Sequence, residues 1–511
     1  MKKILKYTLI AWIALFSSSC KDFLDINNDP SVPQKVSATT IMQPLLAQMA
    51  RGEAFDTRYI GLYTQMFALS STGDTWERHG YLTGSDAAGE MWRSHYYSIG
   101  KNIDLMIDDA ASTNSNDIIG ASKAIRAWSW QSSTDVYNEM ILTQAWEPNR
   151  YVFDFDSQDK VYEEVVRLSN EALADFDKGG TPRLKLGDII YGGDAAKWKK
   201  FIYGILARNA NHLSNKASLY KPDDVIKYCD LALASNLDNF KVPHVATSSL
   251  DANFFGPLRS NFGNFRASST IVKLLDGTAF GGVRDPRLPI MIPPSPDSIF
   301  RGLQVLTVDP NNVAGNTKRI GNIWGAAPGS TSVALSPNAG FATNGRWIFK
   351  DAEPHYIMNA AEIQFIKAEA AFRKGDKATA LTAYKNGIGS HMDFCGVTAV
   401  NKTTFLASAA VKQDGAALTL ADIMQQKYIA LWGYGALEAW VDMRRYKYDT
   451  QIYTTFVPLT TSQYFPDNNG KLAYRVRPRY NSEYVWNRES LNKTGGNNAD
   501  YHTYEPWFMK P

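Results

Sequence analysis

The sequence has few cysteines, almost no excess charge and, beyond its first residues, no long apolar run. Only three of its 511 residues are cysteine, so the fold does not depend on a disulfide framework. Lysine and arginine number 54 against 51 aspartates and glutamates, which argues against nucleic-acid binding by bulk charge. No stretch approaches about 18 consecutive apolar residues, which excludes a multi-span membrane protein. The composition, 44% hydrophobic and 12% aromatic, is that of a large globular chain.

The motifs of common enzyme classes are also missing. The chain has no GxxxxGK[ST], GxSxG, HExxH or CxxC, so nucleotide-binding, esterase and zinc-protease functions lose their main support. His391, Asp393 and Cys395 form a loose group that we interpret as a helix end and not as a metal site. Cys229 and Cys395 are predicted to be buried free thiols, although a pairing of the two stays open. We expect no catalytic residue, cofactor or metal.

The amino terminus has the order of a secretory signal. The basic MKKILK is followed by ten apolar residues and then by small residues that end at Cys20. A segment this short does not span a bilayer, so we predict that residues 1–19 are a cleaved signal peptide. Cys20 then resembles the lipid-attachment site of a bacterial lipoprotein, with residues 20–40 as a tether. The alternative is an ordinary signal peptide with a chance cysteine. Cleavage removes three lysines and leaves a formally neutral chain.

Helical periodicity dominates the rest of the sequence. Apolar residues recur at spacings of three and four, and the ranges 356–374 and 376–391 resemble a tetratricopeptide helix pair. We predict a single, mainly α-helical domain over 41–511, with an irregular insert at about 236–355 that contains one short helix near 268–276. The predicted helices are 41–51, 55–70, 88–111, 117–140, 158–178, 194–215, 221–235, 356–374, 376–391 and 419–446.

Tryptophans in polar, glycine-containing loops are the main candidates for a ligand site. Trp76 has Asp74 and Arg78 as near neighbours, and Trp324 follows Asn322. A sugar ring presents a flat C–H face that stacks on indole, and its hydroxyl groups suit nearby carboxylate, amide and guanidinium groups. We therefore predict Trp76 and Trp324 as stacking platforms, with the other three as hydrogen-bonding partners. The alternative is that each ring fills a gap in the core.

Several longer motifs occur in one order along the chain. The segment Ala361–Ala370, AEIQFIKAEA, is the most specific, and Asp285–Leu288 reads DPRL. With them the chain from residue 20 to 511 resembles the SusD/RagB lipoproteins, in particular their SusD-like branch. One departure is NEMI after Tyr137, where the family commonly has Gly-Asp-Ile-Pro. Other matching positions are Asp25, Asn27, Pro30, Trp92, Tyr96, Asn102, Thr134–Tyr137, Glu438, Trp440, Arg444, Arg445, Arg477, Tyr480, Glu483 and Asn487.

The resemblance implies a mainly α fold in which a tetratricopeptide-like scaffold carries a loop-rich binding region. It implies a lipid-anchored protein of the outer membrane that binds a nutrient oligosaccharide and delivers it to a SusC-like TonB-dependent transporter, without catalysis. Lys21 and Asp22 resemble an export signal that favours the cell exterior. A peptide-binding, RagB-like protein is the alternative, and a surface glycosidase a distant third, because paired carboxylates are defined by distance in space. The group Glu438, Asp442 and Arg445 is interpreted as surface ion pairs on a packed helix.

Overall fold

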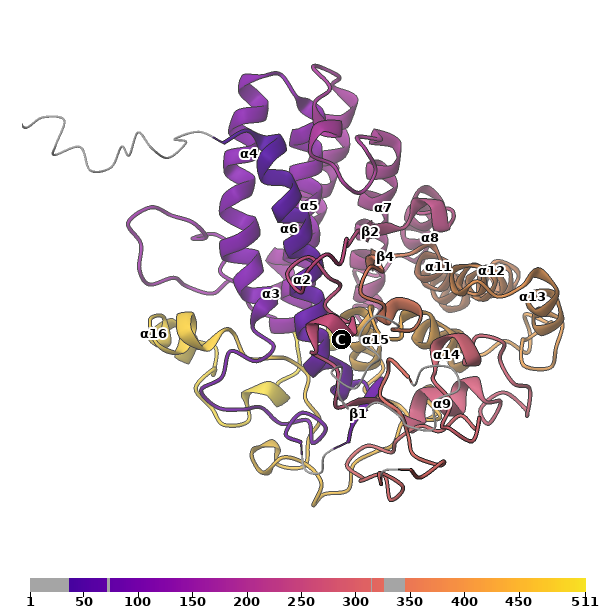
Figure 1. The fold of residues 1–511 in the computed structure, drawn as a ribbon. Coiled ribbons are helices and arrows are strands. Elements are labelled where there is room, and N and C mark those ends of the chain that lie inside the picture. The colour runs from indigo at the N-terminus through magenta and orange to yellow at the C-terminus, as the bar shows by residue number, and fades with distance from the viewer. Residues whose placement is uncertain (1–35, 71–73, 314, 326–344) are drawn as a thin grey trace, which may run out of the picture.

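Helices dominate the computed structural model, which describes residues 36–70, 74–313, 315–325 and 345–511 (Figure 1). The predicted signal peptide, Cys20 and the Asp25, Asn27 and Pro30 opening lie outside these ranges. The predicted mainly α fold is confirmed. The helices are α2 (Ala38–Tyr63), α3 (Glu90–Arg93), α4 (Lys101–Ser112), α5 (Asn116–Tyr137), α6 (Gln158–Asp177), α7 (Ala195–His212), α8 (Pro222–Leu231), α9 (Ser269–Leu275), α10 (Leu288–Met291), α11 (Ala360–Lys374), α12 (Lys377–Cys395), α13 (Ala399–Leu406), α14 (Leu420–Leu431), α15 (Ala436–Arg445) and α16 (Arg488–Lys493).

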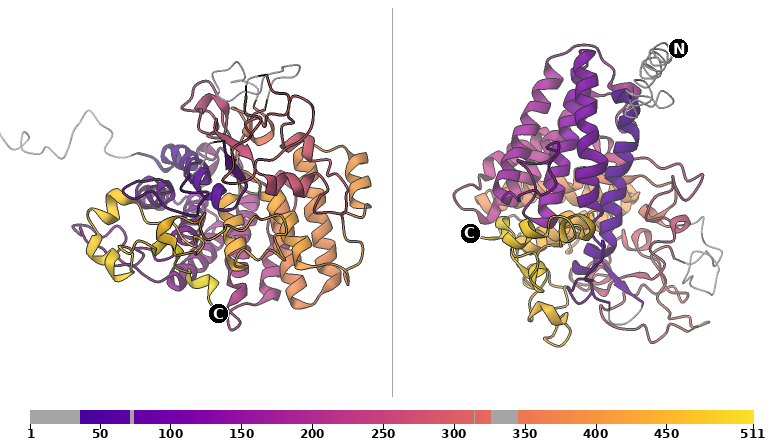
Figure 2. Two further views of the ribbon diagram at one scale, coloured as in Figure 1. Left: turned by 90° about the horizontal axis from the view of Figure 1, so that it is seen from below. Right: turned by 90° about the vertical axis from the view of Figure 1, so that its left-hand side faces the viewer.

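The central helices form an array in which each packs on the next. From α4 the contacts run through α5, α6, α7 and α8, and the array then continues directly with α11 and α12 (Figures 1 and 2). The chain between α8 and α11 is therefore an excursion from a continuous stack of helices. Such stacking is how tetratricopeptide-like units bury their apolar faces.

Short strands close the excursion at its base. β2 (Phe240–Val242) pairs antiparallel with β4 (His355–Met358), so the chain leaves the array and returns at the same place. β1 (Phe67–Leu69) pairs with β3 (Phe265–Ala267) and ties the end of α2 to the insert. The short helix predicted within the insert is confirmed as α9.

Local sequence signals explain the helix ends at α11 and α12. The Asn359 side chain accepts a hydrogen bond from the backbone N–H of Glu362, 2.8 Å away, and so caps the start of α11. Gly375 ends α11 with φ 86°, a conformation in which glycine carries no side-chain penalty. Asp376 then caps α12 by accepting from Thr379 N.

Four predicted helices differ from the structure, since 41–51 and 55–70 form one helix and two others are divided. α2 runs through Gly52 without the predicted break, and Gly52 is buried in it, where a Cβ would lie 3.0 Å from the Met91 sulfur. The range 88–111 divides into α3, a π-helix and α4. The range 419–446 divides into α14 and α15 around Gly433, whose φ is 92°. Periodicity alone did not reveal these breaks.

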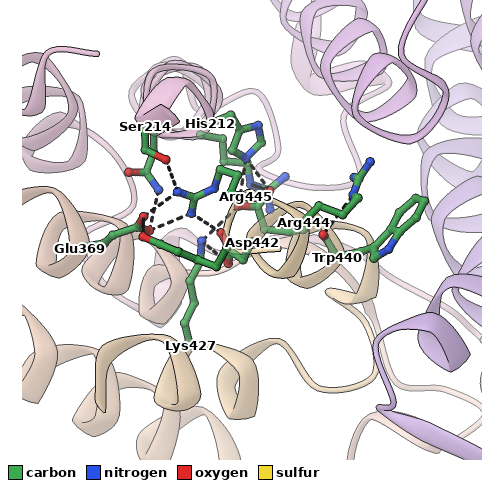
Figure 3. Close-up of polar contacts among 12 residues, drawn as sticks. His212, Ser214, Glu369, Lys427, Trp440, Asp442, Arg444 and Arg445 are labelled. Carbon is green, nitrogen blue, oxygen red and sulfur yellow. Dashed lines mark hydrogen bonds and ion pairs between the residues drawn. The ribbon is translucent and has the colours of Figure 1, made fainter. Parts of the chain in front are cut away.

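Charged side chains from α11, α14 and α15 meet in the interior of the array (Figure 3). Arg445 donates to both carboxylate oxygens of Glu369, at 2.6 and 2.9 Å, and also to Asp442. Lys427 lies 2.8 Å from Asp442 and 3.2 Å from Glu438. The interpretation of Glu438, Asp442 and Arg445 as surface ion pairs is therefore wrong, because all three residues are buried.

The same network extends to α5 and α7. His212 lies 3.1 Å from Glu438 and 3.3 Å from Asp135. Burial alone would lower the pKa of His212, but these two carboxylates outweigh it and raise the pKa to about 9. The imidazole is therefore charged at neutral pH. Arg208 donates to Glu362 at 2.7 Å and joins α7 to α11. We name the set Asp135, Arg208, His212, Glu362, Glu369, Lys427, Glu438, Asp442 and Arg445 the central ion network.

We predict that Arg445→Met destabilises the protein by about 3–5 kcal/mol, because buried Glu369 would lose its two-pronged partner and keep only Arg373 as a counter-ion, at 3.5 Å, and Asp442 would keep only Lys427. Arg167→Met is the matched control, since Arg167 pairs with Glu164 on the exposed face of α6 and should cost at most about 1 kcal/mol. Unfolding monitored by circular dichroism measures both. Equal losses in the two variants would contradict the role of the network.

Candidate functional site

A cavity of about 450 Å³ opens where three distant segments of the chain meet. This volume lies within the range of small-molecule sites. Its walls come from α3 and the residues that follow it, from 141–153, and from 479–483. We name it the aromatic pocket; it is lined by Trp92, Arg93, Tyr96, Tyr97, Ile141, Ala145, Trp146, Phe153, Arg479, Ser482 and Glu483.

Two of these walls are π-helical. The first π-helix, Ser94–Gly100, joins α3 to α4 and carries Tyr96 and Tyr97, and the second spans Tyr480–Tyr484 and carries Glu483. π-Helical turns are rare and occur frequently at functional sites, because the wider turn changes the direction of side chains. Here each of the two π-helices supplies residues that line the aromatic pocket.

The aromatic lining is held in place by hydrogen bonds to the backbone. The Trp146 indole N–H donates to the carbonyl of Tyr96 at 2.8 Å. The Tyr96 hydroxyl in turn donates to the carbonyl of Ile141 at 3.1 Å and accepts from its N–H at 2.7 Å. Trp146 has φ 60°, a strained value for a bulky residue. Gly100 makes this packing possible, because a Cβ there would overlap the Trp146 ring.

One carboxylate, Glu483, lies at the base of the pocket. It accepts from the Trp92 indole N–H at 3.2 Å and from the Asn487 amide at 2.8 Å. Burial raises the pKa of Glu483 above its usual range, although these donors favour the ionised form. Asn487 also exchanges two 3.0 Å hydrogen bonds with the backbone of Phe153. The three walls are therefore tied to one another.

The mouth of the pocket combines an exposed ring with two arginines. Tyr97 is 72% exposed, and the Arg93 guanidinium lies 5.6 Å from its ring centroid. Arg93 also donates to Glu90 at 3.1 Å, and Arg479 lies 3.0 Å from Asp86. Each guanidinium has five N–H donors, so these contacts leave donors for a ligand. The arrangement suits a flat ligand with an apolar face and polar edges.

The structure places Trp76 in the core. Its ring is 4% exposed and packs against Tyr59 and Tyr63, with centroids 4.8 and 5.2 Å away. Asp74 accepts from Trp76 N at 2.8 Å and shapes the turn. Arg78 donates to the carbonyls of residues 463 and 464, at 3.0 and 2.8 Å. These three residues hold a loop in place, and in this structure the Trp76 ring fills a gap in the core, as the alternative interpretation has it.

Trp324 is also buried, at 3% exposed, and its indole N–H donates to the carbonyl of Phe255 at 2.7 Å. Asn322 is 0% exposed and accepts from Gly325 N. The Trp324 ring therefore has no free face for a ligand in this structure. Neither Trp76 nor Trp324 lines the aromatic pocket. Ligand contact by Trp76, Asp74, Arg78, Trp324 and Asn322 stays a prediction that requires these side chains to leave their present packing.

Sequence reasoning missed most of the aromatic pocket. Trp92, Tyr96 and Glu483 stand in the family motifs, but nothing in the sequence brought them together across nearly 400 positions. Tyr97 and Trp146 were not singled out. The one sequence signal that points to the pocket is the cluster of aromatic residues at 92–97. Helical periodicity alone would assign this cluster to the buried face of a helix.

The structure also places the cysteines and the group around His391. Cys229 and Cys395 are buried free thiols, as predicted. Asp393 contacts Lys402, whereas His391 faces inward and lies 2.9 Å from Arg287. Within the described ranges, no three His, Cys, Asp or Glu side chains are grouped to hold a metal ion. No described helix is both long and apolar enough to cross a bilayer.

The stacked helix pairs form a tetratricopeptide-like scaffold with a cavity of ligand size at its side. Residues 28–476 match the SusD-like family profile described as "Starch-binding associating with outer membrane". Because this match covers most of the chain, the protein belongs to the SusD/RagB family. The family is one of binding proteins associated with the outer membrane. No curated protein is significantly similar to the chain.

Solved structures share the fold at low sequence identity. A SusD homologue from Bacteroides fragilis is 18% identical with a TM-score of 0.69, covering 93% of this chain and 100% of its own. A chitin-binding SusD homologue from Flavobacterium johnsoniae is 19% identical with a TM-score of 0.69, at 92% and 98% coverage. A SusD/RagB family protein from Bacteroides thetaiotaomicron is 22% identical with a TM-score of 0.68, at 93% and 99% coverage.

We predict that Gly100→Ala destabilises the protein by about 1–3 kcal/mol, because the added methyl group displaces Trp146 from the pocket wall. Gly389→Ala is the matched control. Gly389 lies within α12, and its Cβ would be 3.8 Å from the nearest atom, Leu406 Cδ1 of α13, so alanine should be neutral or slightly stabilising. Thermal unfolding of both variants tests the claim. It fails if Gly100→Ala unfolds at the temperature of the unaltered protein.

Proposed function

We propose that the protein is a cell-surface lipoprotein that binds a nutrient oligosaccharide in the aromatic pocket and delivers it to a SusC-like TonB-dependent transporter. The observation that carries this proposal is the solvent-exposed Tyr97 ring at the mouth of a cavity of about 450 Å³ with aromatic walls. The family description, which names starch, and the chitin-binding relative both favour a glycan as ligand.

The pocket has the groups that sugar recognition needs. The exposed face of Tyr97 offers a surface for the C–H face of a pyranose ring. Arg93, Arg479 and Ser482 provide donors around that surface for hydroxyl oxygens. Because Trp92 and Tyr96 are fixed by hydrogen bonds, little conformational freedom is lost on binding.

Catalysis is not part of the proposal. A glycosidase of the usual kind needs two carboxyl groups flanking the scissile bond. Among the residues that line the aromatic pocket, Glu483 is the single carboxylate, and both of its oxygens are engaged by Trp92 and Asn487. This arrangement supports retention of a ligand without hydrolysis.

Anchoring and delivery complete the proposal. Lipid attachment at Cys20 would hold the protein on the outer membrane, facing the exterior, with the predicted tether ending at residue 37, before α2. The helical array would then bind the transporter while the aromatic pocket receives the ligand. This division of roles rests on the family membership and on the position of the pocket at the side of the array.

We predict that Tyr97→Ala weakens oligosaccharide binding about tenfold, since ring stacking contributes on the order of 1 kcal/mol. Tyr97→Phe is the control, because it keeps the ring and should keep most of the affinity. Isothermal titration with chitotetraose and maltohexaose measures the dissociation constants. Since Tyr97 is exposed, neither change should alter the unfolding temperature.

Two results would contradict the proposal. Unchanged affinity in Tyr97→Ala would remove the aromatic pocket as the site. If the unaltered protein bound short peptides but neither oligosaccharide, the ligand class would be that of the RagB-like alternative. Product formation during prolonged incubation would instead support a glycosidase.

A further inference from the structure

A second cavity, of about 340 Å³, lies between α2 and the segment 243–259 of the insert. The helix supplies Pro44, Gln48 and Arg51, and the facing segment supplies Leu250, Phe254 and Arg259, among others. We name it the arginine cleft. It shares no lining residue with the aromatic pocket.

The arginine cleft has apolar surfaces that open to solvent. Leu250 is 88% exposed and Val245 is 74% exposed, and both belong to its lining. Pro44 and Pro243 add two rigid rings, and Phe254 lies beneath them with 6% of its surface exposed. Exposed apolar side chains gathered around a cavity are a feature of ligand sites.

Arg259 is held in the cleft without a carboxylate partner among the described residues. One of its terminal nitrogens donates to the carbonyls of Ser249 and Leu250, at 2.7 and 3.3 Å, and its guanidinium lies 5.4 Å from the Phe254 ring centroid. Burial, and then the positive charge of Arg51, lower the pKa of Arg259. Two like charges thus act on each other within one cleft.

Arg51 has only a weak, shared counter-ion. Its Nε lies 3.9 Å from Glu90 Oε1, an oxygen that already accepts from Gln48 and Arg93, each at 3.1 Å. The Arg51 side chain is 52% exposed. A guanidinium with this environment keeps most of its donors for an anion.

The remaining titratable groups do not neutralise the cleft. Asp251 is the one acidic residue in its lining, and it accepts hydrogen bonds from Ser248 N at 2.6 Å and from Thr247. Burial, helped by the charges of His355 and Arg259, lowers the pKa of His244 to about 4. His244 is therefore neutral at pH 7, and the two arginines leave an excess of positive charge.

We propose that the arginine cleft is a second ligand site, which binds a sugar ring bearing a carboxylate. The carboxylate would be held by Arg51 and Arg259, since guanidinium groups recognise carboxylates with paired donors. The C–H face of the ring would lie on the apolar wall formed by Pro44, Pro243 and Leu250. A uronate unit has both features, and an uncharged hexose lacks the anion.

Isothermal titration of the full mature chain with methyl β-D-glucuronide, and with methyl β-D-glucoside as the neutral control, tests this proposal. We expect the glucuronide to bind at least tenfold more tightly, and more weakly as salt is raised. Arg259→Gln and Arg51→Gln should each weaken its binding at least fivefold. Arg167→Gln, on the exposed face of α6, should have no effect.

Arg51→Gln keeps the test valid if Arg259→Gln misfolds, because Arg51 is exposed and makes a single ion contact, at 3.9 Å. Equal binding of glucoside and glucuronide, or full affinity in Arg51→Gln, would overturn the proposal. Equally tight binding of N-acetyl-L-glutamate would overturn the sugar assignment. Tyr97→Ala should leave glucuronide binding unchanged. If this variant lost glucuronide binding, the glucuronide would lie in the aromatic pocket and the second site would be overturned. Neutral oligosaccharides test the aromatic pocket independently.

Discussion

The central ion network is the interaction on which the rest of the structure depends. Its members come from α5, α7, α11, α14 and α15, so it connects helices on both sides of the long insert. Buried charges cost free energy unless each has its partner in good geometry. We infer that the network specifies which helices meet, beyond what apolar packing alone would decide.

A fixed array lets the binding regions be built from irregular chain. The insert leaves and rejoins the array through the β2–β4 pair, so its loops are positioned without regular structure of their own. The aromatic pocket is held similarly. Its walls are joined by the contacts of Glu483 with Trp92 and of Asn487 with Phe153. Rigid support for a ligand site on loops is a common arrangement in binding proteins.

The sequence predicts the helical array well, for physical reasons. Spacings of three and four mark buried faces, and Gly375 marks the end of α11, whereas the predicted range 356–374 starts too early and takes in residues of β4. It does not predict the π-helical turn after Arg93, because a wider turn keeps nearly the same residue pattern. It also does not reveal what covers a side chain. Trp76 and Trp324 have polar neighbours along the chain, yet distant aromatic and backbone groups bury them.

Hydrogen–deuterium exchange with and without the oligosaccharide that binds, chitotetraose or maltohexaose, tests the location of the site most directly. The account predicts slower exchange in peptides that cover 93–100, 141–153 and 479–486, the walls of the aromatic pocket. Peptides around Trp76 and Trp324 should exchange as before. Protection confined to those two loops, with the pocket walls unchanged, would contradict the account and restore the two tryptophans as the ligand platform.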